Sequence, residues 1–147
     1  MSFSVPPEKS EVSVKEEPTL EATDTSVTQF QEAQINLTAE EVVEIIKKSI
    51  VFGINEEEVY CPEKLTKWCT NITEECIQRL ADLKKPFKYV VFCDVGQNFG
   101  NGMHHTITTF WDRLKDRVFT ETWTNQTIIA IVTVICVCTE ITRDTMM

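Results

Sequence analysis

The run Ile128–Cys138, with the sequence IIAIVTVICVC, constrains the fold of this chain more than any other stretch. Only Thr133 interrupts its apolar character, and most of its residues are β-branched, which favours an extended backbone. The run is too short for a membrane-spanning helix, which needs about 20 residues. We therefore predict a strand that is covered on both faces and lies at the centre of a sheet.

Two further strands are predicted within Lys85–Asp112, on either side of a glycine-bearing turn at residues 98–102. The first strand covers Phe87–Gln97. It has apolar side chains on both faces, and we therefore expect it to be internal to its sheet. One of its faces is expected to form the core of the sheet and of a dimer, and this face carries Phe87, Tyr89, Val91, Cys93 and Val95.

The second of these strands is predicted over residues 103–111, which are rich in threonine and only half apolar. Such a composition is typical of an exposed or partner-facing strand, to whose edge an extended peptide can add through main-chain hydrogen bonds. Spacing alone leaves an alternative open, because a five-residue turn also suits a hairpin with the first strand. The candidate partner-binding residues are Met103, His104, His105, Thr106, Ile107, Thr108, Thr109, Phe110 and Trp111.

Two amphipathic helices are predicted before the first strand. The sequence Thr38-Ala-Glu-Glu41 forms a capping box for a helix that runs to about Phe52 and is ended by Gly53. Pro62 suits the first turn of a second, longer helix that ends near Leu83. In both segments the apolar residues recur at intervals of three and four, so each helix has one face to bury.

A remaining strand is predicted at Val118–Trp123, which completes an α+β fold. In this fold two N-terminal helices pack on one face of a four-stranded antiparallel sheet. Helices on one face leave the apolar side chains of the other face exposed, over a larger area than soluble monomers usually tolerate. We therefore expect a dimer, formed sheet to sheet or by strand exchange.

Composition limits the classes of partner and the cellular compartment that we expect for this chain. The formal net charge of −9 disfavours a nucleic-acid partner, because phosphate binding needs a basic surface. The N-terminus lacks the cationic and apolar pattern of a secretory signal, and no run is long enough for a membrane span. We therefore expect a protein of the cytoplasm without membrane contact. In that reducing compartment the six cysteines are expected to be free thiols.

Three segments are predicted along the chain. Residues 1–37 contain seven acidic and two basic residues and little apolar periodicity, a composition typical of a disordered arm. The folded domain is predicted over residues 38–141, and residues 142–147 are expected to form a tail.

The positions and spacing of the cysteine and histidine residues disfavour a catalytic or metal site. Cys93 with His104 or His105 resembles a thiol nucleophile and its base, but a thiol on an apolar strand face stays protonated. Cys136 and Cys138 share one strand face, yet no spaced second pair of ligands completes a tetrahedral zinc site. We expect no catalytic residue, metal or cofactor. The three tryptophans are expected to anchor the core.

The stretch Lys64–Val132 resembles the dynein light chains of the Tctex type. The resemblance is carried, in one order along the chain, by Lys64-Leu65-Thr66-Lys67-Trp68, Thr70-Asn71, Lys85–Val91, Cys93, Gly102 with His104 or His105, Phe110-Trp111-Asp112, Trp123, Asn125, Thr127 and Ile131-Val132. None of these matches is a catalytic signature.

This resemblance implies a dimer in which the second strand crosses to the partner chain, either a second copy or another Tctex-type light chain. It also implies a non-catalytic role on the dynein intermediate chain in microtubule-based movement. A dynein-independent dimeric adaptor for cargo or signalling partners is the alternative. The chain departs from the family pattern in its acidic arm, in Arg117 at a usual glycine, and in the extra residues 139–147. Long arms resemble members found with ciliary dyneins, so an axonemal location is also expected.

Overall fold

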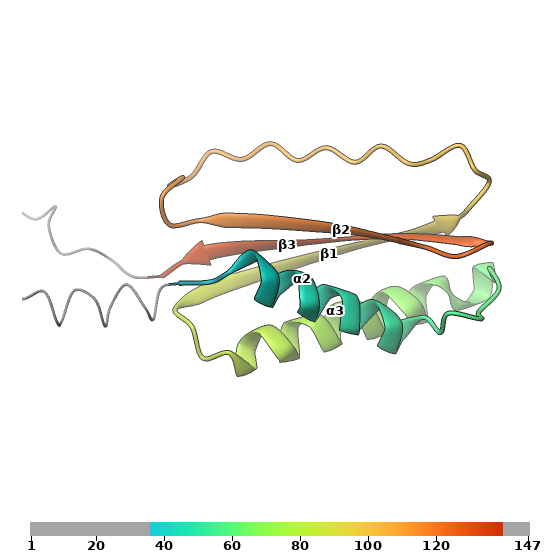
Figure 1. Ribbon diagram of the computed structural model, residues 1–147, viewed down its shortest axis with the longest axis horizontal. Coiled ribbons are helices and arrows are strands. Elements are labelled where there is room, and N and C mark those ends of the chain that lie inside the picture. The colour runs from blue at the N-terminus through green and yellow to red at the C-terminus, as the bar shows by residue number, and fades with distance from the viewer. Residues whose placement is uncertain (1–35, 140–147) are drawn as a thin grey trace, which may run out of the picture.

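The computed structural model describes residues 36–139, which form two helices and three strands (Figure 1). In chain order the elements are α2 (Ala39–Gly53), a short 3-10 turn η1 (Pro62–Lys64), α3 (Leu65–Asp82), β1 (Phe87–Gln97), β2 (Arg117–Thr124) and β3 (Ile128–Cys138). The predicted acidic arm lies outside the described residues except for its last two positions. The predicted tail lies outside them entirely.

Helix α2 begins at the predicted capping box. The N–H of Glu41 donates to Oγ1 of Thr38 at 3.3 Å, and the N–H of Thr38 donates to Oε2 of Glu41 at 3.1 Å. The helix ends at Gly53, one residue after the predicted position, and Ile54, the C-cap residue, has an extended backbone. Glycine is needed at position 53 because α3 passes close by. A Cβ atom at Gly53 would lie only 2.3 Å from Cγ1 of Ile72. The capping box therefore fixes the start of the helix, and the glycine allows its last turn to pack against α3.

The sheet has the order β1-β3-β2, and both neighbouring pairs are antiparallel. The central position predicted for Ile128–Cys138 is confirmed, as are the bounds predicted for the strand Phe87–Gln97. The prediction that Phe87–Gln97 is internal is wrong within the described chain. Among residues 36–139, β1 pairs only with β3, so one of its edges is open.

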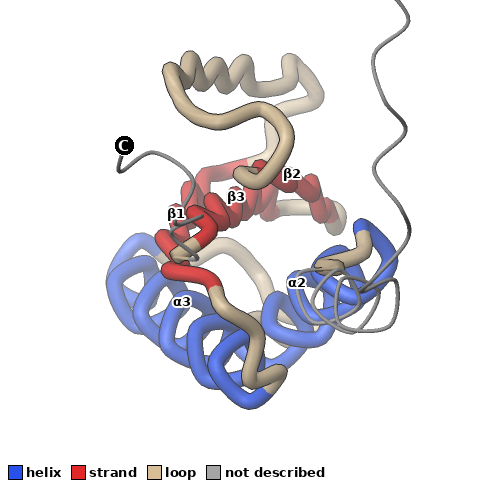
Figure 2. The backbone as a smooth tube through the Cα atoms, turned by 90° about the vertical axis from the view of Figure 1, so that its left-hand side faces the viewer, coloured by secondary structure: helices blue, strands red, loops and turns tan. Residues whose placement is uncertain are grey.

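The described chain also lacks the predicted fourth strand. Residues 103–111 are extended, but they belong to no sheet. They lie in the long connection between β1 and β2, which runs back along the face of the sheet that the helices do not cover (Figures 1 and 2). An alternating pattern specifies an extended backbone, whereas a strand also needs a neighbouring backbone to bond, and here none is adjacent.

Both helices pack on one face of the sheet, as predicted (Figure 2). The core therefore lies between the helices and alternate residues of the strands. Neither helix of the described segment is long and apolar enough to cross a membrane. The core cluster contains Leu37, Val42, Ile46, Ile50, Ile54, Trp68, Ile72, Cys76, Leu80, Ile128, Ala130, Val132, Val134 and Cys136.

Candidate partner-binding surface

The open edge of β1 is a row of unpaired backbone groups. At the two ends of the β1–β3 pair, the N–H of Asn98 donates to the carbonyl of Thr127 at 2.8 Å and the N–H of Thr139 donates to the carbonyl of Pro86 at 2.9 Å. Bonded pairs alternate along an antiparallel ladder, so the even-numbered residues of β1 bond to β3. The odd-numbered residues therefore direct their N–H and C=O groups to the open edge, where only the N–H of Phe87 has a backbone acceptor among the described residues, the carbonyl of Lys85 at 2.8 Å.

These odd-numbered residues are the ones predicted to form the core of the sheet. Their side chains face the helices and are half-buried against the core cluster. Burial raises the pKa of Tyr89 to about 12 and also raises the pKa of Cys93. Their role in a dimer stays a prediction. The set thus combines side chains that hold the core with backbone groups that face outward, and it consists of Phe87, Tyr89, Val91, Cys93 and Val95.

The candidate partner-binding segment, residues 103–111, presents a second row of unpaired backbone groups. No backbone–backbone hydrogen bond joins these nine residues to any other residue between 36 and 139. The outward side chains, those of His104, Thr106, Thr108 and Phe110, are exposed. Because the backbone is already extended and its polar groups lack backbone partners, the segment has the conformation that strand pairing requires.

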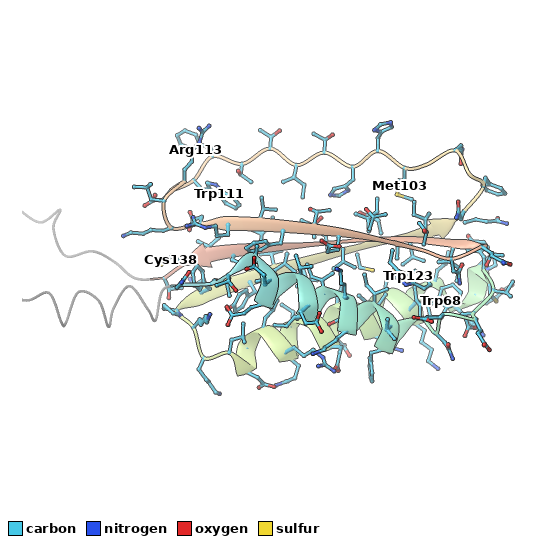
Figure 3. All side chains as sticks on the ribbon, in the orientation of Figure 1. Trp68, Met103, Trp111, Arg113, Trp123 and Cys138 are labelled. Atoms are coloured by element: carbon cyan, nitrogen blue, oxygen red, sulfur yellow. The ribbon has the colours of Figure 1, made fainter. Side chains whose placement is uncertain are left out.

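The alternate side chains of the segment face the sheet. Figure 3 shows Met103 and Trp111 pointing from the segment toward the strands. His105 lies between them in sequence, with its Nδ1 atom 3.2 Å from Oδ2 of Asp94 on β1. Ile107 is half-buried, as is Trp111. The predicted core role of Trp111 is therefore not observed, whereas Trp68 and Trp123 do belong to the core or pack against it.

The face of the sheet beneath the segment carries many apolar side chains and is only partly covered. Ile129 and Ile131 of β3 are buried, at 9% and 4% exposure. Four apolar side chains toward the sides and one end of this face retain between 37% and 48% exposure, namely Val90, Phe92, Val118 and Val137. The exposed apolar face that the one-sided helices predicted is therefore present. Part of it is covered by residues of the same chain.

Polar side chains fix both ends of the long connection, and the sequence pattern did not reveal them. At its start, Nδ2 of Asn98 donates to the carbonyl of Asn125 at 2.9 Å. At its end, the buried carboxylate of Asp116 accepts the N–H of Asp112 at 3.0 Å and the N–H of Cys138 at 2.9 Å. Nothing in the local sequence around Asp112 and Asp116 indicates the contact with β3.

Arg117 stands at the position where the resemblance noted in the sequence implies glycine. Its Nη1 atom donates to the carbonyl oxygens of Asp116 at 2.9 Å and Arg113 at 3.2 Å. The guanidinium group therefore closes the loop that carries Asp116, and the larger side chain is accommodated without loss of β2.

The thiol of Cys93 and the imidazole of His105, the residues of the disfavoured catalytic pair, lie on opposite sides of the sheet. Cys93 faces the helices, and its burial disfavours the reactive thiolate. His105 contacts Asp94 on the open face. All six cysteines of the chain lie between residues 36 and 139 and are free. Within that range, no group of three or more Cys, His, Asp or Glu side chains is placed to hold a metal ion.

Comparison with known proteins identifies the family of this chain. The model of the Tctex-1 family matches residues 36–137. Over 104 residues the chain is 33% identical to the Homo sapiens protein named "Dynein light chain Tctex-type 3", and the match covers 71% of this chain and 89% of that protein. The Drosophila melanogaster protein "Dynein light chain Tctex-type" is 30% identical over 95 residues, which are 65% of this chain and 85% of that protein. The chain belongs to the Tctex-1 family.

Proposed function

We propose that this chain is a non-catalytic dynein light chain, which dimerises by exchanging residues 103–111 and binds a dynein intermediate chain by β-strand addition. It would serve motor assembly on the cytoskeleton, in the cytoplasm or the axoneme. The names of its relatives support the association with dynein. The observation that carries the binding mode is the extended segment 103–111, which has no backbone partner among the described residues.

Strand exchange would satisfy two open edges at once. The segment has nine residues and β1 has eleven, so the segment of one chain can pair along most of β1 in another. Burying an unpaired backbone N–H or C=O group costs free energy, whereas pairing it with another strand forms a hydrogen bond that avoids this cost. Two copies related by a two-fold axis would each donate a segment and each receive one.

An exchanged segment would still have a free edge. Each strand has two edges, and pairing with β1 of the partner uses only one of them. An extended stretch of intermediate chain can add to the other edge, with main-chain hydrogen bonds supplying affinity and alternate side chains supplying selectivity. A two-fold dimer offers two such edges. Binding of a second intermediate chain within a preassembled pair is then effectively intramolecular, which strengthens weak single contacts.

Adjacent proline substitutions test this arrangement. Neighbouring residues of a strand direct their N–H groups to opposite edges, so Thr108→Pro and Thr109→Pro each remove a donor from a different edge. We expect one variant to weaken dimerisation and the other to weaken intermediate-chain binding with the dimer intact. Sedimentation and calorimetric titration with the intermediate chain measure the two effects.

Alanine substitutions at the same two positions provide matched controls, because they remove the side chain and keep the N–H group. Circular dichroism should show unchanged helix content in all four variants. Proline variants that bind and dimerise as the alanine controls do would refute strand addition at this segment. A dimer that never binds intermediate chain would instead favour the dynein-independent adaptor.

A further inference from the structure

Positive charge gathers at the end of the sheet where β3 finishes. Residues 84–88 lead into β1 and residues 113–117 lead into β2, and we call these two stretches together the basic sheet end. They hold six of the eleven lysine and arginine residues between positions 36 and 139, namely Lys84, Lys85, Lys88, Arg113, Lys115 and Arg117. The one acidic residue within them is Asp116, whose buried carboxylate accepts two backbone N–H groups.

The two basic stretches lie on either side of β3. The N–H of Thr139 donates to the carbonyl of Pro86 at 2.9 Å, and the N–H of Cys138 donates to Oδ1 of Asp116 at 2.9 Å. In the sheet order β1-β3-β2 the stretches are thus two strand spacings apart, about 10 Å. Figure 3 shows Arg113 and Cys138 at this same end. One short peptide can therefore meet cations from both stretches.

Lys88 and Arg113 are the cations best placed to receive an acidic ligand. Both side chains are exposed, and neither forms an ion pair with a carboxylate between residues 36 and 139. Lys88 projects to the open face of the sheet, because the odd-numbered side chains of β1 pack on the helix side. The guanidinium group of Arg117 donates to carbonyl oxygens, which do not cancel its charge.

The carboxylates near this end do not reverse its charge. Glu40 and Glu41 begin α2 on the helix side of the sheet, where Glu41 pairs with Lys85. Asp82 and Asp112 flank the basic stretches in sequence. Even with these four carboxylates and the buried aspartate counted, the six cations leave this end positive, whereas the rest of residues 36–139 carries a net negative charge.

The acidic arm joins the fold at this same end (Figure 1). The carbonyl of Asn36, the first described residue, accepts a hydrogen bond from Nζ of Lys85 at 2.5 Å. Residues 16–24, EEPTLEATD, hold four acidic residues and no basic one. The chain from Asp24 to Asn36 can span up to roughly 40 Å, which is enough to bring this segment to any of the six cations. Residues 140–147 are less acidic, with two acidic residues and one basic.

We propose that the basic sheet end is a binding site for an acidic peptide segment, and that residues 16–24 of the same chain occupy it. Because the segment is tethered close by, its effective concentration at the site is on the order of millimolar, so weak contacts are enough to hold it. An acidic partner must displace the arm before it reaches Lys88 and Arg113. The site does not depend on strand exchange, since the cations belong to one chain.

A fluorescently labelled peptide of residues 16–24, titrated into the full chain, measures whether the site is occupied. The arm variant Glu16→Gln with Glu17→Gln and Glu21→Gln should release the arm. We expect its affinity for the peptide to exceed that of the wild type by about threefold to tenfold, because a tethered competitor has been lost.

A matched control variant separates this effect from net charge. Glu56→Gln with Glu57→Gln and Glu74→Gln changes the net charge by the same amount at exposed positions outside the arm and the basic sheet end. Its affinity for the peptide should stay close to that of the wild type. Raising the sodium chloride concentration to 0.5 M should weaken peptide binding to every variant, because salt screens exposed charges.

Charge reversal in the arm variant locates the site. Lys88→Glu with Arg113→Glu should abolish peptide binding, whereas Lys47→Glu with Lys67→Glu, at exposed positions on the helices, should leave most of it. No peptide binding by the arm variant, or equal losses from the two double reversals, would overturn the site. Equal peptide affinities of the wild type and the arm variant would overturn the arm as its occupant and leave a site for an acidic partner.

Amide chemical shifts of the full chain provide a second measurement. At low salt, the resonances of residues 84–88 and 113–117 should differ between the wild type and the arm variant, and the difference should vanish in 0.5 M sodium chloride. Identical resonances at low salt, or differences confined to other parts of the fold, would contradict binding of the arm at the basic sheet end.

Discussion

At the scale of single residues, Asp116 anchors the loop that follows the candidate partner-binding segment, residues 103–111. Its carboxylate accepts two backbone N–H groups, those of Asp112 and Cys138, and it is only 9% exposed. The first of these contacts closes the loop after the segment, and the second fastens that loop to the last residue of β3. Removing the carboxylate would leave two donors without this acceptor in a largely buried position.

We predict that Asp116→Ala lowers the free energy of unfolding by about 2 kcal/mol, in the range for hydrogen bonds to a charged group. Asp112→Ala is the comparison. Its Oδ1 atom accepts the N–H of Leu114 at 2.9 Å in an exposed turn, so its loss should cost less than about 1 kcal/mol. Urea denaturation of both variants measures the difference. Equal costs would show that Asp116 is not an anchor.

The contact between Asp116 and Cys138 could not be predicted from the sequence. Cys138 lies 22 residues from Asp116, and nothing in the local pattern of either residue indicates the other. The same holds for Asn125, whose Nδ2 atom donates to the carbonyl of Glu58 across 67 residues at 2.8 Å. Local patterns reveal capping and periodicity, whereas a polar contact between distant loops depends on how the elements have packed.

At the scale of elements, Lys85 joins the start of α2 to the start of the sheet. Its Nζ atom donates to Oε2 of Glu41 at 2.6 Å and to the carbonyl of Asn36 at 2.5 Å. The hydrogen bond from Lys85, followed by that from the Thr38 backbone, lowers the pKa of Glu41 below its ordinary value of 4.5. A carboxyl whose pKa is depressed in the folded state stabilises the fold above its unfolded pKa, and this contribution is lost as the pH falls.

We therefore predict that Lys85→Met destabilises the protein at pH 7 by about 1 kcal/mol or less, because Glu41 stays 40% exposed and solvent screens the pair. The difference from wild type should shrink as the pH falls below about 4.5 toward 3. Lys48→Met is the control, since its pair with Glu44 is exposed on both sides. Thermal unfolding at several pH values is the measurement, and a pH-independent effect of Lys85→Met would contradict the linkage.

The strands show what periodicity does and does not specify. Phe87–Gln97 and Ile128–Cys138 have the predicted bounds, because their alternation or continuous apolar character matches a sheet with a core on one face. Residues 103–111 have a similar alternation and are extended, yet they are unpaired within the described chain. The pattern of side chains specifies the backbone conformation, whereas the pairing partner depends on which edges are open nearby.

At the scale of the whole molecule, the two faces of the sheet differ in what covers them. The helices cover one face and build the core against alternate residues of β1, β2 and β3. The other face carries exposed apolar side chains and the segment 103–111 (Figure 1). The open edge of β1 and the segment each present backbone N–H donors and C=O acceptors, the groups that pair two strands. On this account, function resides in backbone hydrogen bonds between chains, and the fold keeps both partners extended and accessible.

Amide hydrogen exchange across residues 103–111, followed as a function of protein concentration, tests this account most directly. In dilute monomer these amides lack backbone acceptors and should exchange rapidly. As dimer forms, alternate amides of the segment should become protected together with the odd-numbered amides of β1 from Tyr89 onward. Rapid exchange throughout residues 103–111 at concentrations where sedimentation shows a dimer would contradict strand exchange.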